Sequence, residues 1–427
     1  MSNPPSVSAP SVGAPQTCSL EDQQSWLRSH VRQDYLWNAR TPDLAPTGFI
    51  DLRAYFNALL FQGDSVIPQD RFSGFGPTPE YDLYYEQGRT LGFGVAVAGQ
   101  EVLGQPTQPL WVRYVEPNSP AAAADVRRGD RVLSLNGVPT PQVIAAEDFS
   151  ALVAQAEGNV LTLDIQREGQ LIQRRIVARV YDLAPVQPAK VLNTVNGQRV
   201  GYLYVHAFLA QSESLMDRAF ETLVSQGITE LVVDLRYNTG GFVIVGERLA
   251  SFVGGQSKGG LVYTDLVYNS NNRRLNTRYR LTDRMGWPGL RRVYVLAGQR
   301  TCSASEQFVN GLRGAGVEVI QVGDTTCGKP VGFNARAHCG NTFSIVMFES
   351  LNAQGVGGYY NGIAPNCPAE DDWSKPLGDP TEGLVSVALS HAATGQCPAK
   401  LAQRKQGSLQ SRAWPWVEPM QPPAMLR

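Results

Sequence analysis

The chain has 427 residues, of which 43% are hydrophobic and 18% charged, and its formal net charge is −1. This length predicts two or three domains. The balanced charge excludes the basic surface that binding to nucleic acid or an anionic membrane requires. No apolar run in the sequence is long enough to cross a bilayer as a helix. The 42 glycines and 28 prolines indicate many turns and few long helices.

The N-terminal part is predicted to be a flexible linker followed by a small helical unit. Residues 1–19 are rich in Pro, Ser and Ala and lack the basic start and apolar stretch of a signal peptide. Residues 20–38 and 51–62 place apolar side chains at helical spacing. We therefore expect two helices within a unit spanning residues 20–83.

Between residues 84 and 182 the hydrophobic period changes from 3.6 to 2. Short strands are predicted at 91–99, 109–115, 130–137 and 159–178. The last of these is expected to fold back as a hairpin over Glu168 and Gly169. Two helices are predicted, at 120–126 and 145–156. Many short strands with two helices indicate a compact, partly open β-barrel.

Residues 185–398 alternate between strand and helix patterns. Strands are predicted at 201–208, 230–236, 291–298 and 317–323, and helices at 212–226, 243–254 and 303–316. This alternation is typical of βαβ units and a mostly parallel sheet, and the apolar strands fit burial on both faces. Residues 399–427 lose periodicity and are predicted to be a poorly ordered tail.

One candidate site lies where the strand at 230–236 turns toward the next helix, in the sequence VVDLRYNTGG. Gly240 and Gly241 let the backbone come close to a ligand, because glycine has no Cβ. Backbone N–H groups at such a turn can bind developing negative charge. The same residues also fit an ordinary turn in which Asn238 and Gly240 adopt left-handed conformations.

A second candidate is Ser303, at the start of the helix predicted over 303–316. Glu306 lies three residues later, which is the spacing of a capping box and would make Ser303 a helix cap. A helix N-terminus also favours a nucleophilic serine, since its free N–H groups can stabilise an oxyanion. The residue pattern alone leaves both interpretations open.

The order of these motifs resembles the carboxyl-terminal processing (tail-specific, S41-type) serine peptidases. DLRYNTGG is followed by SASE and, after one more helix and strand, by Gly328-Lys329. Upstream, LGFG at 91–94 with SPAAAADVRRGDRVLSLNG at 119–137 resembles a PDZ domain. Downstream, NGIAPNCP at 361–368 resembles the segment that follows the catalytic strands in that family.

The resemblance covers about residues 85–395 and implies an α/β fold with three parts. These are a small helical N-terminal unit at 20–83, a PDZ β-barrel at 84–182 and a crotonase-like (ClpP/crotonase type) peptidase core at 185–398. In the PDZ domain, the loop formed by Leu91, Gly92, Phe93 and Gly94 would offer backbone N–H groups to a peptide carboxylate.

The resemblance also implies a Ser-Lys dyad, with Ser303 as nucleophile and Lys329 as general base. Such a lysine needs an apolar, enclosed setting that lowers its pKa toward neutrality. No other charged residue lies within four positions of Lys329. The oxyanion hole would consist of the backbone N–H of Ala304 and one from Gly240 or Gly241. No metal or organic cofactor is implied.

The sequence departs from the family after the lysine. The family commonly has a Gln four positions on, which orients the amine, whereas this chain has Phe333 there and Asn334 next. Asn334 could take that role after a small shift of the loop. The missing Gln also keeps open an alternative, a non-catalytic PDZ-containing scaffold that only binds peptides.

Other side chains compete for the catalytic roles. Ser305 is the alternative nucleophile, and because residues two apart point to nearly opposite sides of a helix, only one of the two serines can face Lys329. A hydrolase with Ser-His chemistry would use His206 or His338, backed by a carboxylate. A core or surface histidine is the commoner case, so we favour Ser303 with Lys329.

The six cysteines allow 15 complete pairings, and the spacing of zinc ligands is absent. If the predicted dyad meets, a Cys302–Cys327 bridge is possible. Cys327–Cys339 is equally compatible with the sequence, and Cys367–Cys397 could follow. A nucleophilic role for Cys302 is the least favoured. Disulfides predict an exported protein of the bacterial periplasm or cell envelope, whose native export signal is absent from this chain.

Together these observations predict a serine endopeptidase that acts through an acyl-enzyme. Its partners would be polypeptides, either unfolded or with exposed C-terminal segments, and neither nucleic acid nor a membrane span is expected. The PDZ domain would recruit substrate or gate access to the site.

Overall fold

The computed structural model describes residues 17–284, 287–290, 292–398 and 424–426. The N-terminal linker prediction lies almost wholly outside this set, as does most of the predicted tail. Among the described helices, none has the length and apolarity that crossing a bilayer would need.

The largest part of the molecule is built on a six-stranded sheet in the order β10-β11-β12-β16-β17-β22. Its strands are β10 (Lys190–Asn193), β11 (Arg199–Tyr204), β12 (Glu230–Asp234), β16 (Arg292–Ala297), β17 (Glu318–Gly323) and β22 (Cys367–Pro368). Only β10 runs antiparallel to its neighbour within this sheet. The predicted α/β alternation with a mostly parallel sheet is confirmed.

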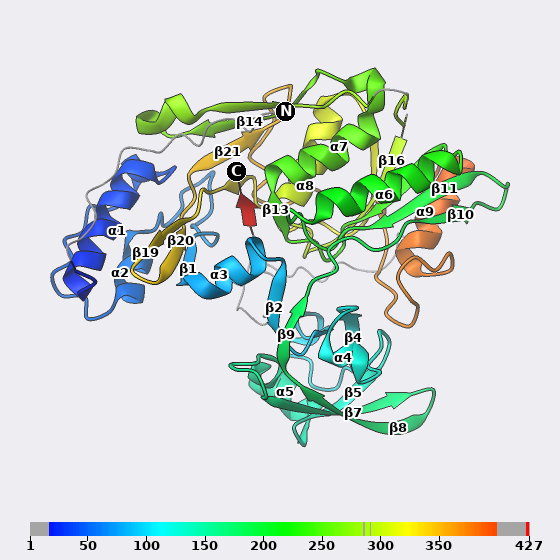
Figure 1. Ribbon diagram of the computed structural model, residues 1–427, viewed down its shortest axis with the longest axis horizontal. Coiled ribbons are helices and arrows are strands. Elements are labelled where there is room, and N and C mark those ends of the chain that lie inside the picture. The colour runs from blue at the N-terminus through cyan, green and yellow to red at the C-terminus, as the bar shows by residue number, and fades with distance from the viewer. Residues whose placement is uncertain (1–16, 285–286, 291, 399–423, 427) are drawn as a thin grey trace.

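Helices cover both faces of this sheet (Figure 1). They are α6 (Ser212–Ser225), α7 (Val243–Lys258), α8 (Ala304–Gly314) and α9 (Gly383–Thr394). Successive strand residues point to opposite faces, so Val233 packs in the core under α6 to α8 while Val232 packs in the core under α9. Burial on both faces explains why these strands have no polar side.

A second sheet, in the order β15-β14-β21-β18, lies between the central sheet and the N-terminal helices. Its strands are β14 (Val262–Tyr268), β15 (Thr277–Arg280), β18 (Val331–Gly332) and β21 (Phe348–Leu351). Val331 and Phe348 share a core with residues of the N-terminal helices. The segment that follows Lys329 is therefore packed between the N-terminal unit and the central sheet.

The N-terminal unit contains α1 (Leu20–Asp34), α2 (Leu52–Leu59) and α3 (Thr78–Tyr85). The two predicted helices are present, although the first ends at Asp34, before the predicted boundary. A small sheet in the order β1-β20-β19 joins this unit to the rest of the chain. It consists of β1 (Gly74–Pro77), β19 (Arg336–His338) and β20 (Asn341–Ser344).

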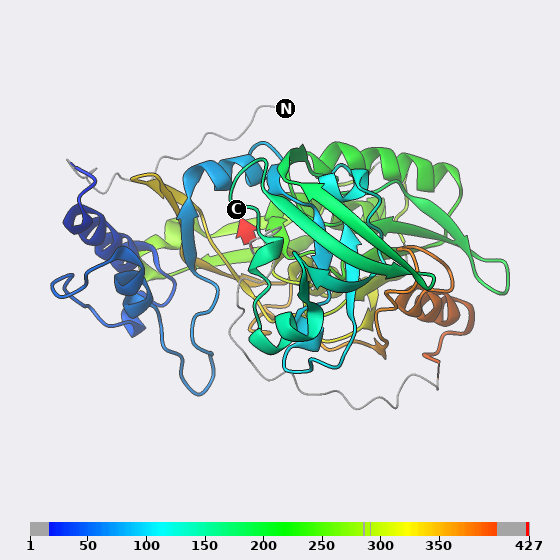
Figure 2. The ribbon, with the colours of Figure 1, turned by 90° about the horizontal axis from the view of Figure 1, so that it is seen from below.

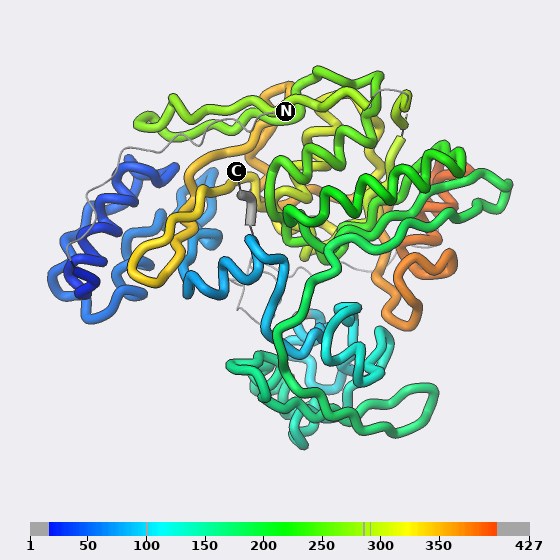
Figure 3. Tube along the Cα trace, in the orientation of Figure 1, coloured from blue at the N-terminus to red at the C-terminus, as the bar shows by residue number. Residues whose placement is uncertain are grey.

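The region predicted as a PDZ domain forms a separate lobe with its own apolar core, which lies at the bottom of Figure 1 and in front of the central sheet in Figure 2. Its sheet has the order β3-β4-β5-β7-β8, with β6 paired to β5. Its elements are β3 (Val95–Val97), β4 (Leu110–Val115), α4 (Pro120–Ala123), β5 (Arg131–Leu135), β6 (Val138–Pro139), α5 (Thr140–Ala146), β7 (Val160–Arg167) and β8 (Gln170–Val177). The chain enters and leaves this lobe through β2 (Arg89–Gly92) and β9 (Arg179–Asp182), which pair antiparallel (Figure 3).

Two local predictions in this lobe have opposite outcomes. The hairpin turn is confirmed, since Glu168 and Gly169 have φ angles of 50° and 83° between β7 and β8. The helix predicted over 145–156 is wrong, because α5 starts at Thr140, where a proline occupies its first turn, and ends at Ala146. The buried side chains that suggested helical spacing beyond it belong to an irregular segment with one 3₁₀ turn.

Candidate active site

Ser303 lies at the end of the loop between β16 and α8, in a backbone conformation that few side chains adopt. Its φ and ψ angles are 62° and −118°, and its side chain is fully buried. Among the described residues, its Oγ has no hydrogen-bond partner. A strained, buried and unsatisfied hydroxyl is unusual in a purely structural serine, and such features gather at functional sites.

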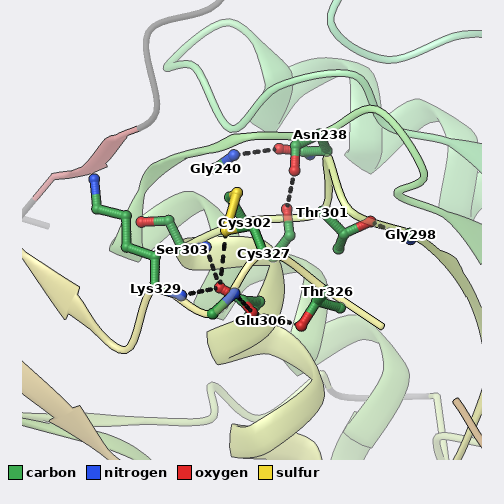
Figure 4. Close-up of a disulfide and its surroundings, with 12 residues drawn as sticks. Asn238, Gly240, Gly298, Thr301, Cys302, Ser303, Glu306, Thr326, Cys327 and Lys329 are labelled. Carbon is green, nitrogen blue, oxygen red and sulfur yellow. Dashed lines mark hydrogen bonds between the residues drawn. A yellow bond between two sulfur atoms is a disulfide. The ribbon is translucent and has the colours of Figure 1, made fainter. Parts of the chain in front are cut away.

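Glu306 connects Ser303 to the segment that carries Lys329 (Figure 4). Its Oε2 accepts the backbone N–H groups of both Ser303 and Lys329, each at 2.8 Å. Its Oε1 accepts the N–H of Gly328 at 2.8 Å and the hydroxyl of Thr326 at 2.5 Å. Burial raises the pKa of Glu306, while these hydrogen bonds act to lower it. One buried carboxylate thus sets the positions of two backbone segments.

A disulfide joins the same two segments. Cys302 and Cys327 are bonded, with their Cα atoms 5.3 Å apart, directly before Ser303 and two residues before Lys329. This pairing is one of the two that the sequence left open for Cys327. The other is excluded, because Cys339 bonds to Cys18.

The third disulfide is Cys367–Cys397, as the sequence suggested. The loop that it closes contains α9, and its length is similar to that of the loop closed by Cys302–Cys327.

Lys329 is fully buried, and aromatic rings surround its ammonium group. Its Nζ lies 4.6 Å from the centre of the Phe333 ring and 5.7 Å from that of Phe72. Burial lowers the pKa of Lys329 from 10.5 to about 7, against the opposing charges of Asp70 and Glu306. A lysine with a pKa lowered in this way can lose its proton near neutral pH, which is what a general base requires.

The N-terminal unit contributes a short segment, residues 70–73, to this environment. Asp70 accepts hydrogen bonds from the hydroxyls of Tyr35 at 2.6 Å and Ser73 at 2.5 Å. Arg71 donates to the carbonyl of Cys327 at 3.0 Å, next to the disulfide. Sequence reasoning missed this contribution, because nothing in the local pattern at 70–73 points to a partner that lies more than 250 residues away.

The turn with the two glycines lies against the loop that carries Ser303. Gly240 and Gly241 have φ angles of 114° and 134°, which favour glycine. A Cβ on Gly241 would lie 2.2 Å from the carbonyl oxygen of Phe208. The Gly240 N–H donates to Oδ1 of Asn238 at 2.8 Å and is thus already in use. Of the two candidate N–H donors, that of Gly241 is not held by Asn238 and points to the edge of the turn away from Phe208.

Asn238 also ties this turn to the serine loop. Its side chain donates to the carbonyl of Val205 at 3.1 Å, and its own carbonyl accepts the N–H of Cys302 at 3.1 Å. The same carbonyl accepts the hydroxyl of Ser305 at 3.1 Å. The structure therefore gives Ser305 a structural hydrogen bond and leaves the hydroxyl of Ser303 unsatisfied among the described residues.

Ala304 is the first residue of α8, in the turn whose N–H groups have no acceptor within the helix.

Asn334, the candidate for orienting the lysine, instead pairs its side-chain amide with the hydroxyl of Tyr268 at 3.3 Å. The ring of Phe333, which holds the family's Gln position, lies next to the ammonium of Lys329.

The two histidines considered as bases lie in other surroundings. His206 stacks on Tyr114 of the PDZ lobe and bonds to Tyr204 at 2.8 Å, and burial lowers its pKa to about 3. His338 stacks on Trp26 of the N-terminal unit. Neither arrangement places an imidazole on Ser303.

The four residues predicted to bind a peptide carboxylate lie at the entrance to the PDZ lobe. Leu91 and Gly92 end β2, where they pair with β9, and Phe93 is buried in the core of the lobe. Gly94 has a φ angle of 78°, and a Cβ there would collide with the side chain of Ser119.

Two contacts connect the PDZ lobe to segments next to the site. Arg300, three residues before Ser303, forms an ion pair with Glu101 of the lobe. Arg128 of the lobe donates to the hydroxyl of Tyr237, the residue before Asn238, at 2.6 Å. These contacts join the lobe to the serine loop and to the segment of the glycine turn.

Removal of the Cys302–Cys327 disulfide is expected to lower kcat about tenfold. Replacing both cysteines with alanine frees the serine loop from the lysine segment, so fewer molecules hold the reactive geometry. Replacing Cys367 and Cys397 with alanine is the matched control, since the two bridges span 25 and 30 residues and each should contribute about 3 kcal/mol to stability. Peptide hydrolysis and thermal unfolding would be measured for both variants. Equal kcat values would contradict the positioning role.

Family models match three parts of the chain. The model described as Peptidase family S41 matches residues 199–367, that of a PDZ domain matches residues 111–167, and that of the Peptidase S41 N-terminal domain matches residues 22–74. These matches fall on the central sheet, the separate lobe and the N-terminal helices.

Curated relatives have lower similarity spread over longer regions. A carboxyl-terminal-processing protease of Picosynechococcus sp. is 28% identical over 298 residues, which cover 67% of this chain and 67% of the relative. The carboxy-terminal processing protease CtpB of Bacillus subtilis is 27% identical over 262 residues, which cover 58% of this chain and 50% of the relative. The chain thus spans about half to two thirds of the length of these relatives.

Two solved structures have the same fold over most of the chain. A putative S41 protease from Bacteroides fragilis is similar with a TM-score of 0.70 and 22% identity, covering 87% of this chain and 97% of that one. The photosystem II D1 C-terminal processing protease is similar with a TM-score of 0.51 and 18% identity, covering 88% of this chain and 99% of that one. At these identities the similarity establishes the fold.

Proposed function

The chain belongs to peptidase family S41, a family of serine peptidases, and from this we propose that it is a carboxyl-terminal processing endopeptidase acting through Ser303 and Lys329. The observation that carries the proposal is the shared anchoring of these two residues. A single oxygen of Glu306 accepts both backbone N–H groups, the Ser303 hydroxyl is unsatisfied among the described residues, and burial lowers the pKa of Lys329 to about 7.

In the proposed reaction, neutral Lys329 takes the hydroxyl proton of Ser303 while Oγ attacks the carbonyl carbon of the peptide bond. The ammonium then gives this proton to the amide nitrogen as the C–N bond breaks, which releases the C-terminal fragment and leaves an acyl-enzyme. Water next gives a proton to Lys329 and attacks the ester. Collapse of that intermediate releases the carboxylic acid, and Ser303 recovers its proton from Lys329.

The negative charge of each tetrahedral intermediate would be held by the backbone N–H groups of Gly241 and Ala304. Gly241 replaces Gly240 in this role because the Gly240 N–H already donates to Asn238. Ser303 is the N-cap of α8, so the N–H groups of the first turn of this helix directly follow the nucleophile in the chain. This proximity supports the assignment of the Ala304 N–H to the oxyanion hole.

Phe333 is proposed to position the lysine in place of the family's Gln. An aromatic ring 4.6 Å from Nζ attracts the ammonium through its π face and keeps water from the amine. The hydrogen bond of Asn334 to Tyr268 favours Phe333 over Asn334 for this role.

We assign residues 20–83 to the N-terminal unit, 84–182 to the PDZ domain and 185–398 to a crotonase-like core. The substrates proposed are unfolded or C-terminally exposed polypeptides, recruited or gated by the PDZ domain with Leu91, Gly92, Phe93 and Gly94 as its carboxylate loop. Three disulfides among the described residues support an exported protein in an oxidising compartment of the cell envelope.

Glu101→Gln is expected to lower kcat a few-fold on both a protein and a short peptide. The substitution breaks the ion pair with Arg300 and so loosens the link between the PDZ lobe and the serine loop. Glu168→Gln is the control, because this exposed hairpin residue removes the same charge from the same lobe. Unchanged kinetics in Glu101→Gln would contradict gating through this contact.

The proposal is tested by cleavage of an unfolded protein. Cleavage should be lost in Ser303→Ala and kept in Ser305→Ala, and a fluorophosphonate should label the wild type at Ser303 only. Equal cleavage by the wild type and Ser303→Ala would overturn the assignment of the nucleophile. Absence of both cleavage and labelling in the wild type would favour the peptide-binding scaffold.

A further inference from the structure

Residues 424–426 form a strand, β23 (Ala424–Leu426), that pairs with the glycine turn of the site. It runs parallel to β13 (Gly240–Phe242), in a register that places Gly240 opposite Ala424 and Gly241 opposite Met425. β23 also contacts α8, which starts after Ser303, and β18, which starts two residues after Lys329. Figure 4 draws this strand, in pale red, in the same view as Ser303 and Lys329.

β13 offers only one free edge to such a strand. On its other side, the Phe208 N–H donates to the carbonyl of Gly240 at 2.9 Å, and the Phe242 N–H donates to the carbonyl of Phe208 at 2.8 Å. A second extended peptide therefore cannot pair with β13 while β23 occupies the remaining edge. Pairing through the main chain tolerates many sequences, which suits a site for varied polypeptides.

We propose that this edge of β13 is the strand-binding site for the substrate, and that residues 424–426 occupy it as a tethered competitor. The proposal rests on the proposed peptidase function and specifies its substrate as an extended segment that pairs in parallel with β13. Pairing there places the backbone of the bound segment next to the turn that would supply an oxyanion donor.

The connection to β23 is long enough for it to act in this way. Residues 399–423 link the part of the chain that ends at Pro398 to β23 and can extend to about 80 Å. A tether of this contour length would give an effective concentration of about 1 mM. A segment that binds with a Kd of about 0.1 mM in trans would then raise the apparent KM about tenfold in cis.

Deletion of residues 399–427 is expected to lower KM about tenfold on an extended peptide substrate and to leave kcat unchanged. A synthetic peptide of residues 418–427 should then inhibit the shortened protein competitively. An unchanged KM together with no inhibition by the peptide would overturn the proposal.

Two substitutions at one position test whether the main chain carries the contact. In this register the Gly241 carbonyl faces the backbone N–H of Leu426, because residues of parallel strands bond to the neighbours of the residue opposite them. Leu426→Pro removes this N–H and should reproduce most of the decrease in KM. Leu426→Ala keeps this N–H and should retain the wild-type KM. Equal KM values for these two variants would contradict strand pairing at Leu426.

A binding measurement separates this inference from the proposed catalytic function. The shortened protein carrying Ser303→Ala should bind the fluorescent 418–427 peptide with a Kd of about 0.1 mM, and Gly241→Ala should abolish this binding. Binding without any hydrolysis by the wild type would refute the peptidase and retain the strand site. Hydrolysis without binding of this peptide would refute the tethered competitor alone.

Discussion

Replacement of Lys329 by methionine is expected to lower kcat/KM by about 10³- to 10⁴-fold while the protein stays folded. Methionine fills nearly the same apolar volume between Phe72 and Phe333 but cannot accept a proton. Lys329→Arg is the informative partner, since it keeps a positive charge that cannot be lost at accessible pH. Substantial activity in either variant would rule out the dyad and reopen a Ser-His mechanism.

The pH dependence of the wild type tests the same residue without substitution. In the proposed mechanism the neutral amine of Lys329 is the reactive form, and burial lowers its pKa to about 7, so kcat/KM should fall tenfold per pH unit below 7 and level off above it. With an ordinary pKa of 10.5, only about one amine in 3,000 would be neutral at pH 7. A rise in kcat/KM that continues to pH 10 would contradict the buried setting of the amine.

Asp70→Asn provides a directional check on this profile. The charge of Asp70 acts to raise the pKa of Lys329, so its removal should move the acidic limb of the profile to lower pH. The asparagine oxygen can still accept from the hydroxyls of Tyr35 and Ser73, but its amide nitrogen then faces the backbone N–H groups of Phe72 and Ser73, so thermal unfolding is measured alongside the profile. If the acidic limb of the kcat/KM profile moved to higher pH or did not move, it would report the titration of a group other than Lys329.

Stability should change in the opposite direction to activity in Lys329→Met. The pKa of Lys329 is lower in the folded protein than its ordinary 10.5, so the unfolded chain binds more protons at this site between pH 7 and about 10. The wild type therefore loses stability as the pH falls through that range. The Lys329→Met variant does not have to lose a proton on folding. Its unfolding temperature should therefore exceed that of the wild type, and the difference should be larger at pH 6 than at pH 10.

The sequence predicted those features that depend on neighbouring residues. Apolar strands such as β12 indicate burial on both faces. Glu168 with Gly169 indicates a hairpin turn from its own two residues, independent of the rest of the fold. The order of the motifs around Gly240, Ser303 and Lys329 was enough to select candidate site residues. It could not reveal that the Gly240 N–H is used by Asn238, which depends on a side-chain rotamer.

The surroundings of Lys329 could not be predicted, because they come from distant parts of the chain. Asp70 and Phe72 belong to the N-terminal unit, and their own segment has no pattern that indicates a catalytic neighbour. The pairing of β23 with β13 likewise joins segments whose local sequence shows no strand periodicity. Glu306 was visible only as a capping residue, since the sequence shows its spacing from Ser303 and not the loop that folds onto it.

Glu306→Ala is expected to reduce kcat by about 10²- to 10³-fold and to destabilise the fold by about 3–5 kcal/mol. The carboxylate accepts four hydrogen bonds, and three of them come from the segment at 326–329. Their loss leaves four buried donors without an acceptor and frees the Lys329 segment from the serine loop. Because Glu306 acts through position alone, KM should change little.

Glu306→Gln separates the two effects, because it keeps the volume of the side chain and one acceptor oxygen. If the amide nitrogen replaces Oε2, it faces the N–H groups of Ser303 and Lys329, and if it replaces Oε1, it faces the N–H of Gly328 and the hydroxyl of Thr326. Either orientation repels one donor pair, so activity should lie between those of the wild type and Glu306→Ala. An acidic limb near pH 7 that persists in Glu306→Gln would show that Lys329 still acts as the base. Wild-type kcat in this variant would show instead that Glu306 only caps the helix.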